Sequence, residues 1–88
     1  LHQNFPNPFN PSTKIRYEIP EASKVNLTVF NVRGQEVVTL QDADQSAGRY
    51  ELQWNGLNRH GTPVSGGVYL CQITAGNYRQ TIKMVYLK

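Results

Sequence analysis

Residues 24–40 read KVNLTVFNVRGQEVVTL. In the first half, Val25, Leu27 and Val29 alternate with polar residues, which is the period of a strand with one buried face. Asn31 and Gly34 then take the first and fourth positions of a four-residue turn, as a type I turn prefers. The stretch therefore predicts an antiparallel β-hairpin whose second strand runs over residues 35–40.

The same period-two alternation recurs on both sides of this hairpin. It predicts further strands over residues 14–19, 49–54, 68–74 and 78–87. Residues 41–48 are polar and are predicted to be a connection. The pattern Asn-x-x-Gly returns at residues 58–61, and Gly76 with Asn77 forms a two-residue loop suited to a tight hairpin. Apolar residues do not recur at helical spacing, so we predict an all-β, Ig-like antiparallel β-sandwich of about seven strands.

Ahead of the first strand lies a proline-rich segment, residues 1–13, which includes Pro6, Pro8 and Pro11. Each proline fixes its own φ and pushes the residue before it towards extended geometry. A plain linker has no use for Phe5 and Phe9, so both rings are predicted to tuck against the sandwich. We expect an ordered, extended arm over residues 1–13 and a single sandwich domain over residues 14–88.

Composition excludes several classes of function. Nine Lys and Arg against six Asp and Glu give a formal charge of +3, and no two basic residues are adjacent. A nucleic-acid surface needs clustered positive charge, so no nucleic-acid partner is expected. The chain has no apolar run of about 18 residues, so no transmembrane segment is expected. It opens at Leu1 with neither an initiator Met nor a signal peptide, which is typical of a domain cut from a longer protein.

Residues with reactive side chains are few and scattered. Cys71 is the one cysteine and lies in a strand pattern, so a buried, inert thiol is expected. A nucleophile needs a neighbouring base, and neither His2 on the arm nor His60 in a turn is placed beside it. Asp42 and Asp44 lie in the polar connection, where a solvated loop is expected rather than a paired carboxylate site. We therefore expect no enzyme, no cofactor and no metal site.

Several blocks of sequence occur in a fixed order along the chain. NFPNPFNPST spans residues 4–13, and Lys83-Met84-Val85-x-Leu87-Lys88 closes the chain. Between them come Val25-x-Leu27-x-Val29-Phe30-Asn31-x-x-Gly34, Gly48, Trp54-Asn55-Gly56, Gly61 and Gly66-Gly67-Val68-Tyr69. In this order and spacing the chain resembles the C-terminal sorting domains of the Por (type IX) secretion system, and the related Ig-like domain of flagellar hook-capping proteins.

The resemblance implies a sorting or secretion signal at the end of a larger exported protein. Its partners would be an outer-membrane translocon, a surface peptidase and the covalently linked N-terminal cargo. Its location would be the periplasm in transit, then the surface or surroundings of a Gram-negative bacterium. The resemblance places recognition at Gly67, Tyr69, Lys83 and Lys88. The residues that carry the fold signature are Pro6, Pro8, Phe9, Asn31, Gly34, Trp54, Gly56 and Gly61. Where the family often has Asp, this chain has Asn31, Asn55 and Asn58, which are poorer cation ligands.

Two alternatives remain open at this point. The domain would serve as a structural Ig-like accessory or assembly module, as in the hook-capping relatives. Or it would be a carbohydrate-binding module of a secreted glycosidase, with an aromatic platform drawn from Trp54, Tyr17, Tyr50 and Tyr69. Alternation places each of these rings on the apolar face of its strand, which favours core packing over a sugar platform.

Overall fold

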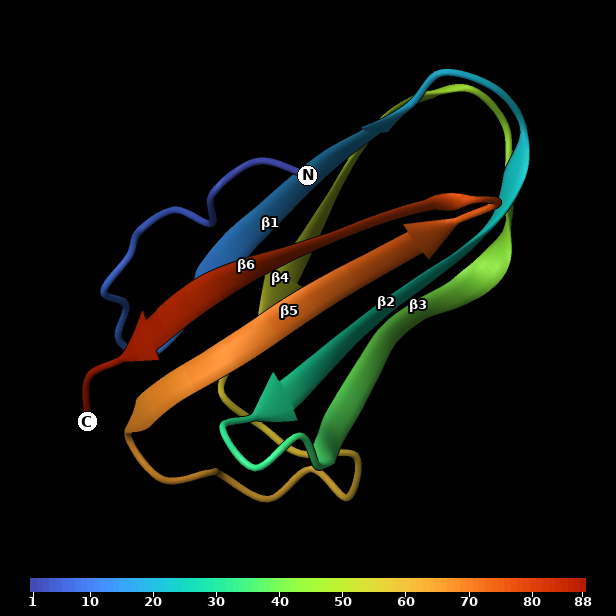
Figure 1. Ribbon diagram of the computed structural model, residues 1–88. Helices are drawn as coiled ribbons and strands as arrows, with labels where there is room; N and C mark the ends of the chain where they lie inside the picture. Colours follow the sequence, from blue (N-terminus) through green and yellow to red (C-terminus); the bar gives the residue numbers. More distant parts are fainter.

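The computed structural model describes residues 1–88 and contains strands but no helix (Figure 1). The six strands are β1 (Thr13–Ile19), β2 (Ser23–Asn31), β3 (Glu36–Gln45), β4 (Gly48–Trp54), β5 (Gly67–Ala75) and β6 (Tyr78–Tyr86). All pairings between them are antiparallel. The predicted all-β, Ig-like sandwich is confirmed. No helix is present that is long and apolar enough to cross a membrane.

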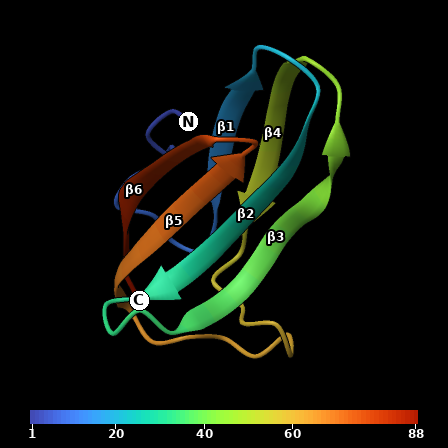
Figure 2. The same cartoon turned by 45° about the vertical axis from the view of Figure 1, so that its right-hand side comes forward.

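The strands form two sheets that face each other. One sheet pairs β1 with β4, and the other has the order β3-β2-β5-β6. Figure 2 shows the two-stranded sheet behind the four-stranded one, with the chain crossing between them from β1 to β2 and from β3 to β4. Both crossings are short: residues 20–22 link β1 to β2, and residues 46–47 link β3 to β4.

The core lies between the sheets and follows from the alternation seen in the sequence. In β1 every second residue is buried, and β5 and β6 repeat this pattern. In the last strand Ile82, Met84 and Tyr86 point inward, which the sequence alone left open because that run is apolar on both faces. Trp54 is buried in this core, and its ring lies edge-on to that of Tyr69, with 5.2 Å between the ring centroids. Its indole N–H donates to the Leu57 carbonyl at 2.9 Å.

Both Asn-x-x-Gly segments form the same turn. In each, the Gly N–H donates to the backbone carbonyl of the Asn three residues earlier, and the Asn side-chain Oδ1 accepts two further backbone N–H groups. Gly34 and Gly61 have φ of 81° and 77°, a left-handed conformation that favours glycine. The two predicted turns are therefore confirmed as type I turns closed by a left-handed glycine.

The prediction that residues 41–48 form a connection is wrong for most of its length. β3 continues through Gln45, because residues 41–45 pair with residues 23–27 of β2. Asp42 and Asp44 therefore lie on a strand rather than in a loop. The polar sequence is compatible with a strand here because β3 is an edge strand, and these two side chains face solvent.

The proline-rich arm closes one side of the sandwich (Figure 1). Its first part pairs with the outer edge of β1, where the His2 N–H donates to the Arg16 carbonyl and Phe5 exchanges two bonds with Lys14. Its second part pairs with the outer edge of β6 through Phe9. Phe9 is 1% exposed, as predicted, whereas Phe5 is 73% exposed. The prediction that both rings tuck inward is thus wrong for Phe5, which is held by its backbone alone.

Candidate recognition surface

The side chains with reactive groups lie apart from one another in the folded domain. Cys71 is buried on β5, and burial raises the pKa of its thiol to about 12, so the nucleophilic thiolate is absent at neutral pH. No group of three or more His, Cys, Asp or Glu side chains lies where it could hold a metal ion. His60 is exposed in the second turn and His2 lies on the arm.

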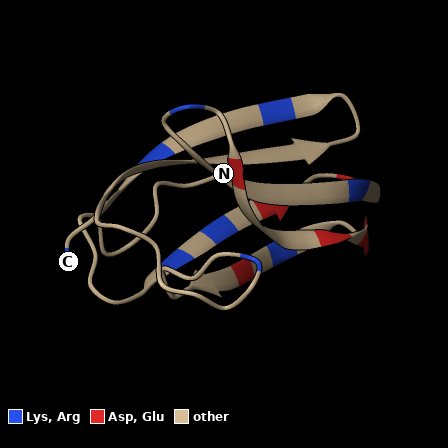
Figure 3. Cartoon of the chain, turned by 90° about the horizontal axis from the view of Figure 1, so that it is seen from below, with Lys and Arg blue, Asp and Glu red and all other residues tan.

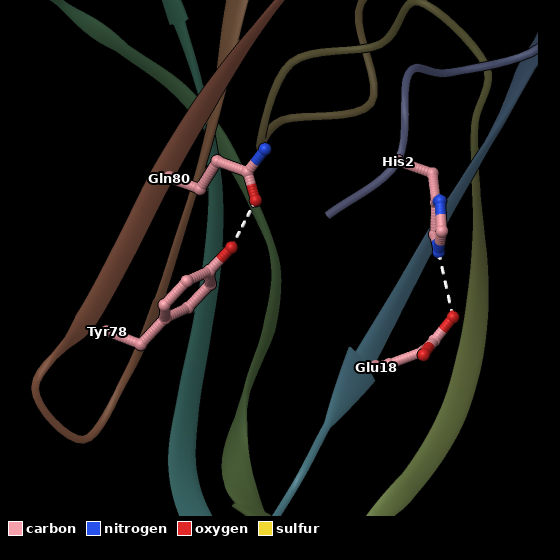
Figure 4. A network of polar contacts seen from close by, with 4 residues as sticks. All are labelled: His2, Glu18, Tyr78 and Gln80. Atoms are coloured by element: carbon pink, nitrogen blue, oxygen red, sulfur yellow. Dashed lines mark hydrogen bonds and ion pairs between the residues drawn. The ribbon is translucent and has the colours of Figure 1, made fainter.

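The hollows on the surface are open and lined by mixed charges. The larger, of about 890 Å³, lies where the β1–β2 and β5–β6 turns meet and includes Glu18, Arg49 and Tyr78. Figure 4 shows two polar contacts beside it, His2 with Glu18 at 2.9 Å and Tyr78 with Gln80. The His2 hydrogen bond holds the pKa of the exposed Glu18 carboxyl below its usual value. These are contacts within the surface, not groups converging on a ligand.

Three of the fold-signature residues, Phe9, Trp54 and Gly56, fasten the arm to the core. Phe9 stacks on Tyr86 at 4.9 Å and lies 5.5 Å from Trp54, measured between ring centroids. Gly56 has φ of 72°, and a Cβ there would lie 2.8 Å from the Tyr86 ring. Phe9 thus packs on Tyr86 and Trp54, and the Tyr86 ring in turn packs against the bare backbone of Gly56. Pro6 and Pro8 are exposed on the arm, whereas Asn31, Gly34 and Gly61 build the two turns.

The structure separates the recognition residues that the resemblance suggested. Tyr69 points into the core, is 7% exposed, and donates its hydroxyl to the Ser65 carbonyl at 2.6 Å. Burial raises the pKa of this hydroxyl. Gly67, Lys83 and Lys88 are exposed. Lys88 donates from Nζ to the Val64 carbonyl at 2.9 Å, and Gly67 lies opposite Tyr86 in the sheet. Gly67 and Lys88 thus lie where β5 begins and β6 ends, Lys83 lies further along β6 opposite Leu70, and Tyr69 points into the core.

Lys83 belongs to a surface that residue patterns did not identify. On the outer face of the four-stranded sheet, Phe30 lies opposite Leu70, Leu70 opposite Lys83, and Val68 opposite Val85. We call these five residues the β5–β6 patch. Val68 is 38% exposed, and Phe30, Leu70 and Val85 are half-buried. Alternation shows that these side chains face outward, but strand register is needed to show that they are neighbours.

The patch is apolar on a face that is otherwise polar. Further along the same face the cross-strand neighbours are Thr39, Thr28, Gln72 and Thr81, and then Asp42, Asn26, Thr74 and Arg79. Thr28 shares a 3.2 Å hydrogen bond with Thr39, so these polar side chains satisfy one another. Lys and Arg are spread over several strands rather than collected on one (Figure 3). The outer face therefore changes from a polar ladder to an apolar patch beside a single lysine.

Comparison with known protein families identifies the family of this chain. A profile described as the FlgD Ig-like domain matches residues 9–79. The chain belongs to the FlgD Ig-like domain family. No curated protein matches this member of the family. The match begins at Phe9, the anchored residue of the arm, and ends at residue 79, before Lys83 and Lys88.

Solved structures include FlgD and two components of the type IX secretion system. FlgD of P. aeruginosa has a TM-score of 0.65 at 21% identity, and the alignment covers 84% of this chain and 58% of that one. PorZ of Porphyromonas gingivalis, described as a surface component of the type IX secretion system, has a TM-score of 0.68 at 16% identity over 97% of this chain and 11% of that one. Latent PorU of the same organism has a TM-score of 0.68 at 18% identity, over 96% and 9%. The FlgD-type domain thus spans about half of FlgD and a small part of PorZ and PorU.

Proposed function

We propose that this FlgD-type Ig-like domain is a sorting signal at the C-terminus of a larger exported protein. In this proposal it directs its cargo through the outer membrane of a Gram-negative bacterium, where a surface peptidase acts on it. The observation that carries the proposal is the β5–β6 patch, an apolar surface beside Lys83 on the outer face of the four-stranded sheet. Contiguous exposed apolar surface rimmed by polar residues is typical of a protein-binding site.

The comparisons support this proposal over a general Ig-like role in one respect. The alignments with PorZ and PorU extend over 97% and 96% of the chain, so the arm and the last strand are part of the shared fold. The FlgD profile ends at residue 79, before the strand residues that complete the patch. A docking partner would offer an apolar surface with a carboxylate for Lys83.

The proposal is tested by fusing residues 1–88 to the C-terminus of a periplasmic reporter in a host with a type IX system. The reporter is expected at the cell surface or in the medium. Val68→Asp and Lys83→Glu should each lower delivery about tenfold, because an unpaired charge buried in an interface costs about 2 kcal/mol or more. Arg79→Glu is the matched control, since it makes the same charge change on the same strand outside the patch.

Point variants are the sharper test, because deleting Tyr78–Lys88 would remove Ile82, Met84 and Tyr86 from the core and unfold the domain. The fold of each variant is checked by circular dichroism and thermal unfolding. A reporter that stays in the periplasm with the unaltered domain would refute the sorting role. Equal delivery of the Lys83→Glu and Arg79→Glu fusions would refute the patch as its docking surface.

The second candidate is an Ig-like structural or assembly module, and the family match itself favours it. The two functions differ in their demand on position, since a sorting signal ends its parent protein and a spacer has no such need. A carbohydrate-binding role has less support, because Trp54, Tyr17 and Tyr69 are buried and form no platform. Binding to a polysaccharide pull-down panel would revive it.

A further inference from the structure

Three of the four sheet edges in this sandwich are covered or interrupted over part of their length. The arm bonds the β1 edge at His2 and Phe5 and the C-terminal end of the β6 edge at Phe9. The β3 edge is interrupted by two β-bulges, and the Arg59 N–H of the second turn donates to its Val37 carbonyl at 3.0 Å. Proteins use such coverings and bulges to prevent strands from pairing with other chains.

The β4 edge has no such protection. Lys14 and Arg16 of β1 direct their backbone groups to the arm, so the residues opposite them on β4, Gln53 and Glu51, also direct theirs away from the pair. The same alternation turns the backbone of Arg49 outward. No hydrogen bond is formed by the outward N–H and C=O groups of these three β4 residues. The strand is seven residues long, with no proline and no bulge.

We propose that this edge pairs with the β4 edge of a second copy of the chain, antiparallel about a two-fold axis. In such a pair an outward-facing residue must lie opposite another one. Centring the pair on Arg49 or on Glu51 sets like charges against each other, and centring it on Leu52 or Gln53 pairs no charges of opposite sign. Centring it on Tyr50 sets Arg49 opposite Glu51 of the second copy, and symmetry repeats this contact.

This register also continues a charge pattern already present within one chain. Glu51 is paired with Arg16 at 3.4 Å, and Glu18 lies opposite Arg49. Across the joined sheet each row would then read Arg16, Glu51, Arg49 of the second copy and Glu18 of the second copy. The charges alternate in sign over four strands, so every neighbouring pair attracts.

The inner side of the same edge is incompletely covered. Tyr50 and Leu52 of β4 are half-buried, and so are Val38 and Leu40 of β3. All four pack against the core, and their strands lie on the side of the sandwich away from the arm (Figure 2). A second copy in the Tyr50-centred register would set its own Tyr50 beside this one, so apolar burial and charge pairing favour the same arrangement.

Sedimentation of the 88-residue chain from low micromolar to near-millimolar concentration tests the proposal. A monomer–dimer equilibrium is expected. Glu51→Pro should raise the dimer dissociation constant about tenfold or more, because it removes an outward N–H that the fold does not use. Thr81→Pro is the matched control: its N–H points outward on β6, so dimerisation should be unchanged. A chain that stays monomeric throughout overturns the proposal, as does equal loss of dimer in both variants.

A second pair of variants keeps the test sharp if a proline unfolds the domain. Arg49→Glu should weaken the dimer, and adding Glu51→Arg to it should restore much of the loss. The register is read from disulfide trapping in a Cys71→Ala background. Tyr50→Cys should cross-link two chains, since Cα atoms at the two-fold lie about 4.5 Å apart. Leu52→Cys should not, and the reverse result overturns the Tyr50-centred register.

Discussion

Gly56 shows how closely one residue can be fixed by its neighbour. Its φ of 72° favours glycine, and a Cβ added there would lie only 2.8 Å from the Tyr86 ring. Gly56→Ala is therefore expected to destabilise the domain by about 2 kcal/mol or more, since strain and overlap both contribute. Gly34→Ala, which meets open space at a similar φ, should cost only about 1 kcal/mol. Urea unfolding of the two variants measures the difference, and equal losses would contradict the close contact.

Glu18 provides a local pH dependence. The hydrogen bond from His2, and to a lesser extent Arg49, lowers the pKa of its carboxyl below 4.5. A lowered folded-state pKa stabilises the fold above the unfolded value and loses that effect as pH falls through the folded value. The arm contact at His2 should therefore weaken in acid. His2→Ala should move the Glu18 pKa upward in a carboxyl NMR titration, and an unchanged value would refute the contact.

At the scale of elements, the arm is a working part of the sandwich, and its two phenylalanines form a matched pair. Phe9→Ala is expected to cost about 3–5 kcal/mol, because it empties the space between Tyr86 and Trp54. Phe5→Ala should change stability by no more than about 0.5 kcal/mol, since that ring is exposed. Thermal unfolding of both variants is the measurement. Similar losses would mean that the arm is held by its backbone and not by its side chain.

Strands could be predicted from the sequence where apolar and polar residues alternate. They could not be predicted where only hydrogen bonding to a neighbouring strand makes the segment a strand. The alternation of Ile15, Tyr17 and Ile19 with charged residues predicted β1, because one face of this strand is buried. Residues 41–45 have no such period, and only the backbone of β2 makes them a strand. Tyr69 has a motif position that suggests recognition, but its alternation with Cys71 and Ile73 favours core packing, and the structure places it in the core. The β5–β6 patch joins three strands, so no local pattern could reveal it.

The whole molecule is expected to lose stability in alkali. Burial raises the pKa of Cys71 from 9.0 to about 12, and it also raises those of Tyr17 and Tyr69. A raised folded-state pKa stabilises the fold below the unfolded value, and the effect is lost as pH rises through the folded one. The free energy of unfolding should thus fall between pH 9.0 and about 12. Cys71→Ala should flatten this decline, and an equally steep decline would show that the thiol takes no part.

Under the proposed function, the arm would also determine how the cargo polypeptide is coupled to this domain. Because hydrogen bonding to β1 starts at His2, tension applied at Leu1 would reach the sheet almost immediately. The backbone hydrogen bonds at His2 and Phe5 would then break in sequence, while the ring of Phe9 stayed in the core. The arm would therefore detach first at His2 and Phe5 and remain bound longest at Phe9. Under the proposed function, tension from the cargo would therefore lengthen the connection before it disturbed the sandwich.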